Sequence, residues 1–224
     1  MSKTGVIIVA GGTGTRMGSE IPKQFLRVRG KEVLVYTLEK FLGALAGAGI
    51  VIVLPQEYFH LWESIADKHG LRGTHRVCAG GENRFMSVKN GLAVLGPCDI
   101  IAIHDGVRPL LSEEMIKKCF DIAAAEGTAI PVVEPADSFR MLSDGYPEII
   151  SRANLRAVQT PQVFREDIIR KAYETEYLPR FTDDASVVEH SGVRLVFCEG
   201  EYRNVKITRP EDMLFAEAVI SSPL

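Results

Sequence analysis

The sequence predicts an α/β fold in which a mostly parallel sheet is flanked by helices. Short apolar runs alternate with helical patterns along the whole chain, which is the order expected of strand–helix units. The runs Val6–Ala10 and Ile50–Leu54 contain no polar residue, as expected of strands buried on both faces of a parallel sheet. Of the 224 residues, 46% are hydrophobic and 25% are charged, so we expect a globular protein with a substantial core.

The individual elements follow from these patterns in chain order. The predicted strands are Val6–Ala10, Ile50–Leu54, Ile100–His104, Ala129–Val133 and Leu195–Cys198. The predicted helices are Val33–Leu45, Gln56–His69, Phe85–Leu95, Ser112–Glu126, Arg165–Glu174 and a last one running to about Ile220. Ser112 supplies a hydroxyl cap for its helix, and Thr208 with Glu211 matches a capping box at the start of the last helix.

One segment, from Glu134 to Gln159, interrupts this alternation. Asp144-Gly145 is a turn signal between the apolar stretches Phe139–Leu142 and Ile149–Ile150, so a β-hairpin is predicted there. A hairpin with few core residues of its own is covered by a second subunit or lies on the surface as a flap. We therefore expect a single domain over residues 1–224 with a β-arm at about 135–158.

Composition excludes several classes of function. The net charge of −3 disfavours general nucleic-acid binding. No membrane span is expected, because the most apolar stretch is broken by glycines and stopped by Pro55, and the N-terminal apolar run is too short for a signal peptide. The cysteines show no zinc-site spacing and are expected to be buried free thiols in a reducing cytoplasm; they are Cys78, Cys98, Cys119 and Cys198.

A glycine-rich turn follows the first predicted strand. Gly11, Gly12 and Gly14 let backbone N–H groups approach an anion or a base, and Arg16 and Lys23 follow as cations. The dinucleotide fingerprint fails because Met17 stands where its third glycine belongs, and the P-loop pattern fails because Lys23 comes too late. A glycine-rich turn alone is more often structural, but the two cations favour a triphosphate or pyrophosphate.

A second group of polar residues lies at the end of the strand Ile100–His104. Asp105 at such a strand end either holds a hard cation such as Mg²⁺ or caps the following loop, and both roles remain open. His104 is expected to be a packed, hydrogen-bonded residue rather than a catalyst. Lys206, within an apparent strand pattern Val-x-Ile, is expected to snorkel or to meet an anion.

No Ser-His-Asp, Cys-His or paired-carboxylate arrangement stands out by spacing. Transfer of a nucleotidyl group to a phosphate acceptor needs no strong protein base, since the acceptor is already ionised. Catalysis then consists of neutralising charge and aligning the attack.

Six segments together resemble a known family: Ala10–Met17, Pro22–Phe25, His104–Pro109, Thr160–Gln162, Thr182–Ala185 and Lys206–Asp212. The first resembles the signature of nucleotide-sugar pyrophosphorylases and related nucleotidyltransferases, and the whole set resembles the 2-C-methyl-D-erythritol 4-phosphate cytidylyltransferase family. The resemblance implies transfer of a cytidylyl group from CTP to that polyol phosphate, with release of pyrophosphate, in isoprenoid biosynthesis. It also implies a Rossmann-like domain, Mg²⁺, and a homodimer whose β-arms reach into each other's active sites.

The resemblance further implies roles for individual residues. Arg16 and Lys23 would bind the triphosphate and stabilise the transition state, while Arg152 and Lys206 would orient the acceptor. The nucleotide would be bound by Ala10, Gly11, Gly12, Gly14, Gly81, Glu82 and Ser87. The acceptor would be bound by Asp105, Gly106, Arg108, Ser138, Thr160 and Thr182, with Asp105 also near the metal and with Arg108 and Ser138 contributing across the dimer interface.

Three alternatives stay open at this point. Glu82 and Ser138 stand where the family usually has Asp and Thr, which leaves D-ribitol 5-phosphate as a second acceptor. A non-catalytic nucleotide-binding module of the same fold is less consistent with the four cations Arg16, Lys23, Arg152 and Lys206. An NAD-dependent dehydrogenase is disfavoured by Met17.

Overall fold

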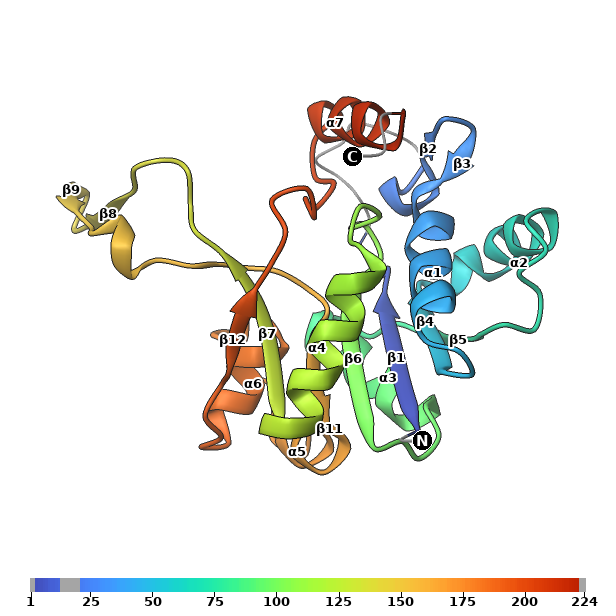
Figure 1. The fold of residues 1–224 in the computed structure, drawn as a ribbon, viewed down its shortest axis with the longest axis horizontal. Coiled ribbons are helices and arrows are strands. Elements are labelled where there is room, and N and C mark those ends of the chain that lie inside the picture. Colours follow the sequence, from blue (N-terminus) through green and yellow to red (C-terminus); the bar gives the residue numbers. More distant parts are fainter. Residues whose placement is uncertain (1–2, 13–20, 222–224) are drawn as a thin grey trace.

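The protein is described by a computed structural model covering residues 3–12 and 21–221 (Figure 1). Within these residues one sheet has eight strands, in the order β10-β7-β11-β6-β1-β4-β5, with β12 paired to β7. The strands are β1 (Thr4–Val9), β4 (Gly49–Leu54), β5 (Arg76–Ala79), β6 (Ile100–Asp105), β7 (Thr128–Val133), β10 (Ala157–Val158), β11 (Gln162–Arg165) and β12 (Phe197–Glu199).

The centre of the sheet is parallel, as the sequence predicts. β1 lies between β4 and β6 and runs parallel to both, and β5 extends this parallel set beyond β4. The other half is mixed, because β11 is inserted antiparallel between β6 and β7 and β10 continues along β7. The sequence reading missed β5, β10 and β11, since each is a short run whose only strong signal is its pairing with distant strands.

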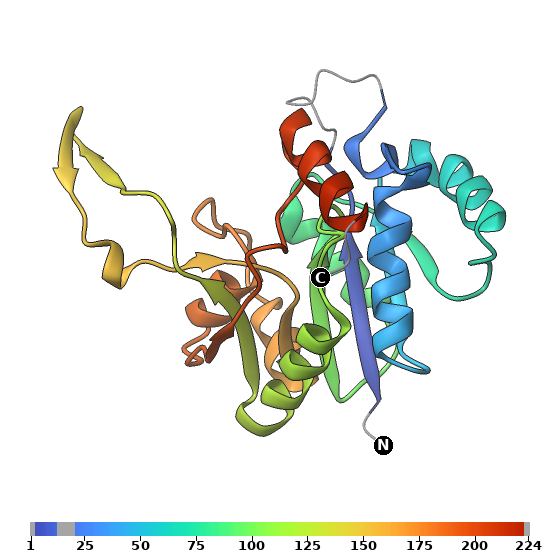
Figure 2. The ribbon, with the colours of Figure 1, turned by 45° about the horizontal axis from the view of Figure 1, so that its top comes forward.

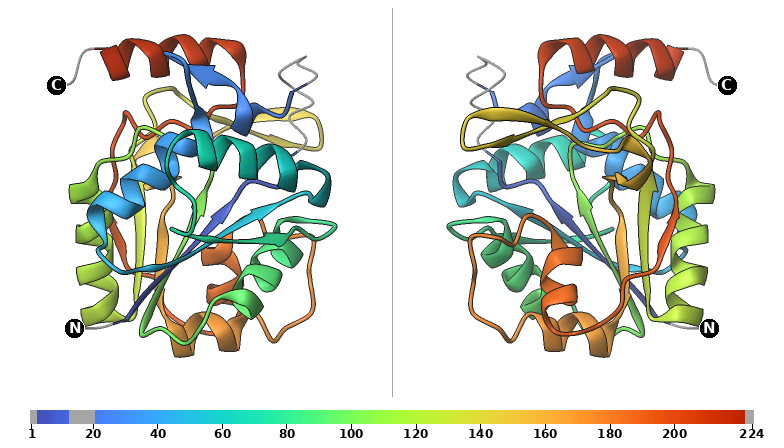
Figure 3. Two further views of the ribbon diagram at one scale, coloured as in Figure 1. Left: turned by 90° about the vertical axis from the view of Figure 1, so that its right-hand side faces the viewer. Right: turned by 90° about the vertical axis from the view of Figure 1, so that its left-hand side faces the viewer.

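Helices cover both faces of the sheet (Figure 3). One face packs against α1 (Val33–Ala44), α2 (Phe59–Lys68) and α4 (Glu113–Glu126). The other packs against α3 (Arg84–Val94), α5 (Glu166–Ala172) and α6 (Asp184–His190). Neighbouring residues of β1 alternate between these two cores, with Ile8 in the first and Ile7 in the second. Such burial on both faces explains why the central strands are uninterrupted apolar runs.

A third, smaller core closes the upper end of the molecule. The hairpin β2 (Arg27–Val28) and β3 (Lys31–Glu32) packs against α7 (Pro210–Ser221), and Val28, Ile207 and Ala216 are buried between them. Asp212, rather than the predicted Glu211, caps this region, since its carboxylate accepts from the N–H and hydroxyl of Thr208 at 2.7 and 2.9 Å. Lys206 lies in an irregular segment before α7 and not in a strand as its spacing suggested.

Two other predicted helices have different bounds. The first begins as a 3₁₀ turn, Gln56–Tyr58, before α2. The second, α5, begins at Glu166, because Arg165 is the last residue of β11 and pairs with Ile100. Helix α6 was not predicted; Asp183 caps it in a capping box with Ser186. No helix in the described part of the chain is long and apolar enough to span a membrane.

The predicted hairpin is confirmed. β8 (Arg140–Ser143) and β9 (Tyr146–Ile149) pair antiparallel, and Asp144 and Gly145 both have positive φ, 49° and 84°, as a two-residue hairpin turn requires. The hairpin projects away from the body of the molecule (Figures 1 and 2). Arg152 follows the turn Asp144-Gly145 in the sequence, which predicts a place on the returning strand; the structure places it instead in the 3₁₀ turn Arg152–Asn154 that follows β9. We call residues 135–158 the arm.

Candidate active site

The glycine-rich segment begins where the central strands end. The N–H of Ala10 donates to the carbonyl of Val53 at 2.9 Å, and the amide of Gln24, itself buried, donates to the carbonyl of Ala10 at 2.7 Å. These two bonds hold the backbone of residue 10 against the sheet. Among the described residues, no atom lies within 4 Å of the position that a Cβ on Gly12 would take, so the backbone has room for a ligand at this glycine.

The loop before α3 faces this segment. The N–H of Gly81 donates to Oγ of Ser87 at 3.0 Å, and that hydroxyl donates to the carbonyl of Asn83 at 2.9 Å. Asn83 caps α3 by accepting from the N–H of Met86. A Cβ on Gly81 would lie 2.4 Å from Cβ of Met86, so only glycine fits this turn. Ser87 therefore shapes the loop with both of its hydrogen bonds.

A cavity of about 420 Å³ opens between these two loops. Its size suits a nucleoside phosphate. Lys23 is on its wall, and its ammonium donates to the carbonyl of Ile207 at 3.0 Å. The sequence-predicted residues that it brings together are Ala10, Gly11, Gly12, Lys23, Gly81, Glu82, Ser87, Asp105 and Lys206. We call it the nucleotide cavity.

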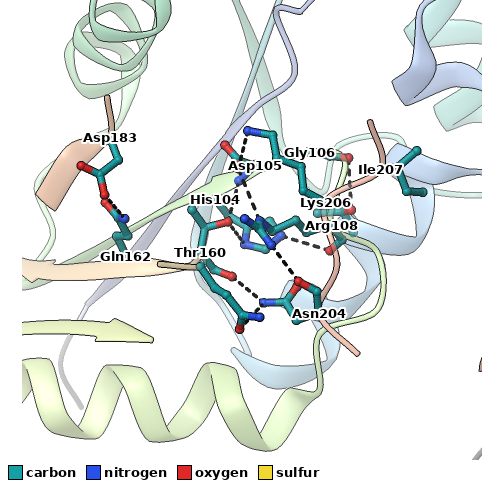
Figure 4. Close-up of polar contacts among 12 residues, drawn as sticks. His104, Asp105, Gly106, Arg108, Thr160, Gln162, Asp183, Asn204, Lys206 and Ile207 are labelled. Carbon is teal, nitrogen blue, oxygen red and sulfur yellow. Dashed lines mark hydrogen bonds and ion pairs between the residues drawn. The ribbon is translucent and has the colours of Figure 1, made fainter. Parts of the chain in front are cut away.

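A cluster of charges centres on Asp105, at the end of β6 (Figure 4). One carboxylate oxygen, Oδ2, lies 2.9 Å from Nζ of Lys206 and 3.4 Å from Nε of Arg108. Oδ1 lies 3.5 Å from Nε of Arg84. Burial acts to raise the pKa of Asp105, but the charges of the three cations outweigh it and hold this pKa well below its usual value. The expectation that Lys206 meets an anion is thus confirmed.

The neighbouring His104 is fully buried and packs edge-on against Phe41, with ring centroids 5.0 Å apart. Its Nε2 donates to the carbonyl of Arg108 at 3.2 Å, which leaves Nδ1 to accept from the Thr160 hydroxyl at 3.1 Å. Burial lowers the pKa of His104 to about 3, so the ring is neutral. It is a structural residue, as the sequence indicated.

A second cavity, of about 140 Å³, lies on the other side of Asp105. Thr160 is held at its wall, because its hydroxyl accepts from the N–H of Asp105 at 3.1 Å and its carbonyl accepts from Nδ2 of Asn204 at 2.9 Å. Arg108, Thr160 and Thr182 line this space, as do Arg84, Asp105 and Lys206. The last three line both cavities and form a shared wall. Arg108 reaches the space from its own chain, where it contacts Asp105 and Asn204, and not across a dimer interface as the resemblance implied. We call the smaller space the acceptor cavity.

Some sequence-predicted residues lie elsewhere. Gly106 lines neither cavity; it is buried behind Asp105, where its N–H donates to the carbonyl of Val9 and a Cβ would lie 2.9 Å from that of Ala10. Ser138 and Arg152 are exposed on the arm, and Arg152 donates to the carbonyl of Ala136 at 2.7 Å. Gly14 and Arg16 lie outside the described residues.

The residues near Asp105 fit only one kind of magnesium site. Among residues 3–12 and 21–221 there is no group of three or more acidic, histidine or cysteine side chains that could hold a metal by themselves. Asp105 is a single carboxylate surrounded by cations. Mg²⁺ in phosphate-transfer sites is commonly held by one or two carboxylates, by waters and by the substrate's own phosphates. An ion that arrives with the nucleotide fits this arrangement, with Asp105 as the protein carboxylate in reach.

A family model described as 2-C-methyl-D-erythritol 4-phosphate cytidylyltransferase matches residues 4–222. The chain belongs to this family. A cytidylyltransferase of that name from Bacteroides fragilis is 47% identical over 214 residues, covering 96% of this chain and 98% of the relative. One from Clostridium botulinum is 38% identical, over 96% of this chain and 98% of that relative.

Solved structures of the same family share the fold. The 4-diphosphocytidyl-2C-methyl-D-erythritol synthase of Anaerococcus prevotii superposes with a TM-score of 0.83 at 28% identity, over 99% of this chain and 97% of its own. The cytidylyltransferase of Thermus thermophilus gives a TM-score of 0.79 at 28% identity, over 99% of this chain and its full length. The expected architecture, a mostly parallel sheet flanked by helices, is thereby confirmed.

Sequence reasoning missed three polar residues of the site. Gln24 stands in the quoted segment Pro22–Phe25, and Asn204 lies two residues before the segment Lys206–Asp212. Neither was singled out, and both act through hydrogen bonds to distant backbone carbonyls. Arg84 reaches Asp105 and Asp184, which are far from it in the chain. One signal was available: an Arg directly after a Gly-Gly loop and a capping Asn, at the first turn of a predicted helix.

Proposed function

We propose that the protein transfers the cytidylyl group of CTP to 2-C-methyl-D-erythritol 4-phosphate. A phosphate oxygen of the acceptor attacks the α-phosphorus of CTP, the bond from that phosphorus to the bridging oxygen breaks, and pyrophosphate leaves. One observation carries this proposal: the cations Arg84, Arg108 and Lys206 gather around Asp105 where a nucleotide-sized cavity meets a smaller one. Such a wall is suited to two phosphates that must meet.

The nucleotide cavity takes CTP in this proposal. The backbone of Ala10, Gly11 and Gly12 and the loop of Gly81, Glu82 and Ser87 hold the cytidine. Lys23 binds the triphosphate, and the resemblance implies the same role for Arg16. Preorganised cations lower the barrier because they need no reorientation while negative charge shifts from the α-phosphorus to the leaving pyrophosphate.

The acceptor cavity takes the polyol phosphate. Lys206 and Arg108 face its phosphate, while Thr160 and Thr182 line the part of the cavity that takes its polyol chain. The buried His104 is neutral, and the lowered pKa of Asp105 makes its carboxylate a weak base. An ionised phosphate needs no strong base, which is why this chemistry suits the site.

The same proposal includes Mg²⁺ and a cytoplasmic location. Asp105 would hold Mg²⁺ together with the nucleotide, and the ion would supply positive charge that favours departure of pyrophosphate. All four cysteines are free and buried, which suits a reducing compartment.

We also propose that the active form is a homodimer with exchanged arms. Phe139, Met141, Leu142, Tyr146 and Ile149 are exposed on the arm of a single chain. Apolar side chains in this number are expected to be covered by a partner. The second copy would bring Ser138 and Arg152 to a site that lacks them within its own chain, and with C2 symmetry each arm would serve the other subunit.

A direct assay tests the reaction. Pyrophosphate release is measured with CTP, Mg²⁺ and 2-C-methyl-D-erythritol 4-phosphate, and in parallel with D-ribitol 5-phosphate. We expect kcat/KM to favour the methylerythritol phosphate. A tenfold preference for ribitol 5-phosphate would assign the second acceptor, and CTP binding without turnover of either would indicate a non-catalytic module.

A further inference from the structure

Arg84 has a position that no other described cation of the site shares. It is the first residue of α3, directly behind the cap Asn83, and its side chain lines both the nucleotide cavity and the acceptor cavity. Lys206 also lines both, but from an irregular segment. Lys23 and Arg108 each line one. Arg84 is thus a guanidinium fixed on a helix, at the wall where the two substrates meet.

A buried carboxylate holds the guanidinium of Arg84 in place. Nη2 of Arg84 lies 2.6 Å from Oδ2 of Asp184, which is fully buried, and Oδ1 of the same carboxylate accepts from the hydroxyl of Tyr173 at 2.7 Å. The ring of Tyr173 stacks on Phe85, with centroids 4.7 Å apart. Burial disfavours the charged guanidinium, but the two aspartates outweigh this and raise the pKa of Arg84. The cation is therefore permanent and held in one orientation.

Part of the guanidinium remains available to a ligand. Nε faces Asp105 at 3.5 Å and Nη2 is engaged by Asp184, while Nη1 has no hydrogen-bond partner among the described residues. The side chain is 27% exposed, toward the cavities. Around it, three cations (Arg84, Arg108 and Lys206) face two carboxylates (Asp105 and Asp184), which leaves one positive charge in excess at the shared wall.

We propose that Arg84 is a catalytic residue, which donates from Nη1 to a non-bridging oxygen of the phosphoryl group being transferred. The α-phosphate of the nucleotide must lie at the wall common to both cavities, because the acceptor phosphate reaches it from the other side. A planar, anchored guanidinium there stabilises charge on the five-coordinate phosphorus better than a flexible ammonium. Asp184 is the positioning residue that holds it. This inference rests on the proposed cytidylyl transfer.

The test compares Arg84→Gln and Arg84→Lys with the wild-type protein in the pyrophosphate-release assay, together with CTP affinity from calorimetry. We expect Arg84→Gln to lower kcat by roughly 10²–10³, the scale for one preorganised donor, while the Kd of CTP changes less than about threefold. Arg84→Lys should recover only part of kcat, since an ammonium cannot bond Asp184 and a phosphate oxygen in the same fixed plane. Arg170→Lys is the matched control: Arg170 binds Glu166 and the carbonyl of Leu92, lines neither cavity, and should lose stability but not kcat.

Chemical rescue separates catalysis from folding. Guanidinium chloride at non-denaturing concentration should raise kcat of Arg84→Ala at least several-fold, and sodium chloride at equal ionic strength should not. Asp184→Asn should lower kcat with a smaller change in CTP affinity. If Arg84→Ala does not fold, Arg84→Lys decides.

Results that would contradict a catalytic role of Arg84 differ from those that would contradict cytidylyl transfer. If wild-type protein transfers cytidylyl groups and Arg84→Gln or Arg84→Lys keeps kcat within threefold, Arg84 is not catalytic and the proposed function stands. The same holds if a folded Arg84→Ala is not rescued by guanidinium. If wild-type protein with CTP releases no pyrophosphate with either polyol phosphate, both proposals are wrong.

Discussion

The charge cluster around Asp105 and the arm are built in opposite ways. Asp105 is buried, and its carboxylate is surrounded by cations supplied by α3, by the loop after β6 and by the segment before α7. In the arm the apolar side chains face outward, with Tyr146 and Ile149 77% and 84% exposed. One region is complete within a single chain, whereas the other presents surface that the same chain does not cover.

This difference separates two parts of catalysis. Charge neutralisation at the reacting phosphorus depends on preorganised groups, which a folded monomer already supplies. Under the proposed arm exchange, closure over the polyol depends on residues that arrive with another copy. Variants in the cluster should therefore act on kcat, whereas variants in the arm should act on acceptor binding and on assembly.

The largest effect is expected for Lys23, on the wall of the nucleotide cavity. Lys23→Ala should lower kcat by roughly 10²–10³, or about 3–4 kcal/mol, because negative charge rearranges most around the triphosphate in the transition state. The Kd of CTP, measured by calorimetry, should change much less. Lys31→Ala is the control, since Lys31 pairs with Glu39 and lines neither cavity. A raised KM for CTP with normal kcat would show that Lys23 only holds the ground state.

In the arm, Arg152→Ala should raise KM for the polyol phosphate and lower kcat. Loss of one charge-assisted hydrogen bond corresponds to about 1.5–3 kcal/mol, or roughly 10–100-fold in kcat/KM. CTP affinity should stay nearly normal. The neighbouring Arg156→Ala is the matched control, because Arg156 donates to the carbonyls of Ala153 and Leu155 within the arm itself. Equal losses in both variants would attribute the effect to arm structure rather than to acceptor contact.

Mixing subunits tests whether the arm serves the other copy. A heterodimer of Arg152→Ala and Lys206→Ala chains concentrates both defects in one site and leaves the other intact if arms are exchanged. A random equimolar mixture should then recover about a quarter of wild-type activity. Absence of recovery in verified heterodimers would mean that Arg152 and Lys206 act from the same chain.

Assembly itself should respond to the exposed apolar residues of the arm. Ile149→Ser should raise the dimer dissociation constant by roughly 10–100-fold, the equivalent of losing about 1.5–3 kcal/mol of apolar burial. Thermal stability of the monomer should hardly change, because this side chain has no core contacts to lose. Leu61→Ser, on α2 far from the arm (Figure 1), should leave association unchanged. Analytical ultracentrifugation distinguishes the two, and equal dissociation constants would exclude the arm as interface.

The smallest effect expected is a pH dependence of the free energy of unfolding, caused by the buried His104. Burial lowers the pKa of His104 to about 3, from an ordinary value of 6.5, so the unfolded chain binds the proton more readily. Its neutral form contributes stability that is present above pH 6.5 and is lost as the pH falls toward about 3. The slope contributed is at most about 1.4 kcal/mol per pH unit.

His75, whose pKa burial lowers to about 4, acts in the same direction. The pKa of Asp105 is also lowered, so its contribution is lost only below about 3.8, its ordinary value. The free energy of unfolding, measured with urea between pH 6.5 and 4.5, should therefore change less with pH in His104→Gln than in the wild-type protein. Ile149→Ser should keep the wild-type pH dependence. An unchanged pH dependence in His104→Gln would mean that His104 does not titrate in this window.

Local patterns in the sequence predicted the parts of the structure that depend on neighbouring residues. Uninterrupted apolar runs predicted the central parallel strands, the glycine-rich turn predicted one wall of the nucleotide cavity, and Asp144-Gly145 predicted the arm's turn. Each of these depends on residues within about ten positions of one another, because strand burial, backbone freedom and turn type are set by neighbours. The lysines and arginines quoted in the motifs identified the chemistry, but not the geometry in which they act.

Contacts between residues far apart in the chain depend on the whole fold. The four residues of β11 carry little local signal and become a strand by fitting between β6 and β7. Arg84 and Asp184 are 100 residues apart, and Thr160 reaches His104 across 56, so no local pattern couples either pair. Conversely, Ser138 and Arg152 are close in the chain to the strands that carry the site, yet the arm holds them away from both cavities. An unpaired charge or polar group in the interior costs free energy, so buried groups are found paired. Which partner is within reach depends on the whole folded chain.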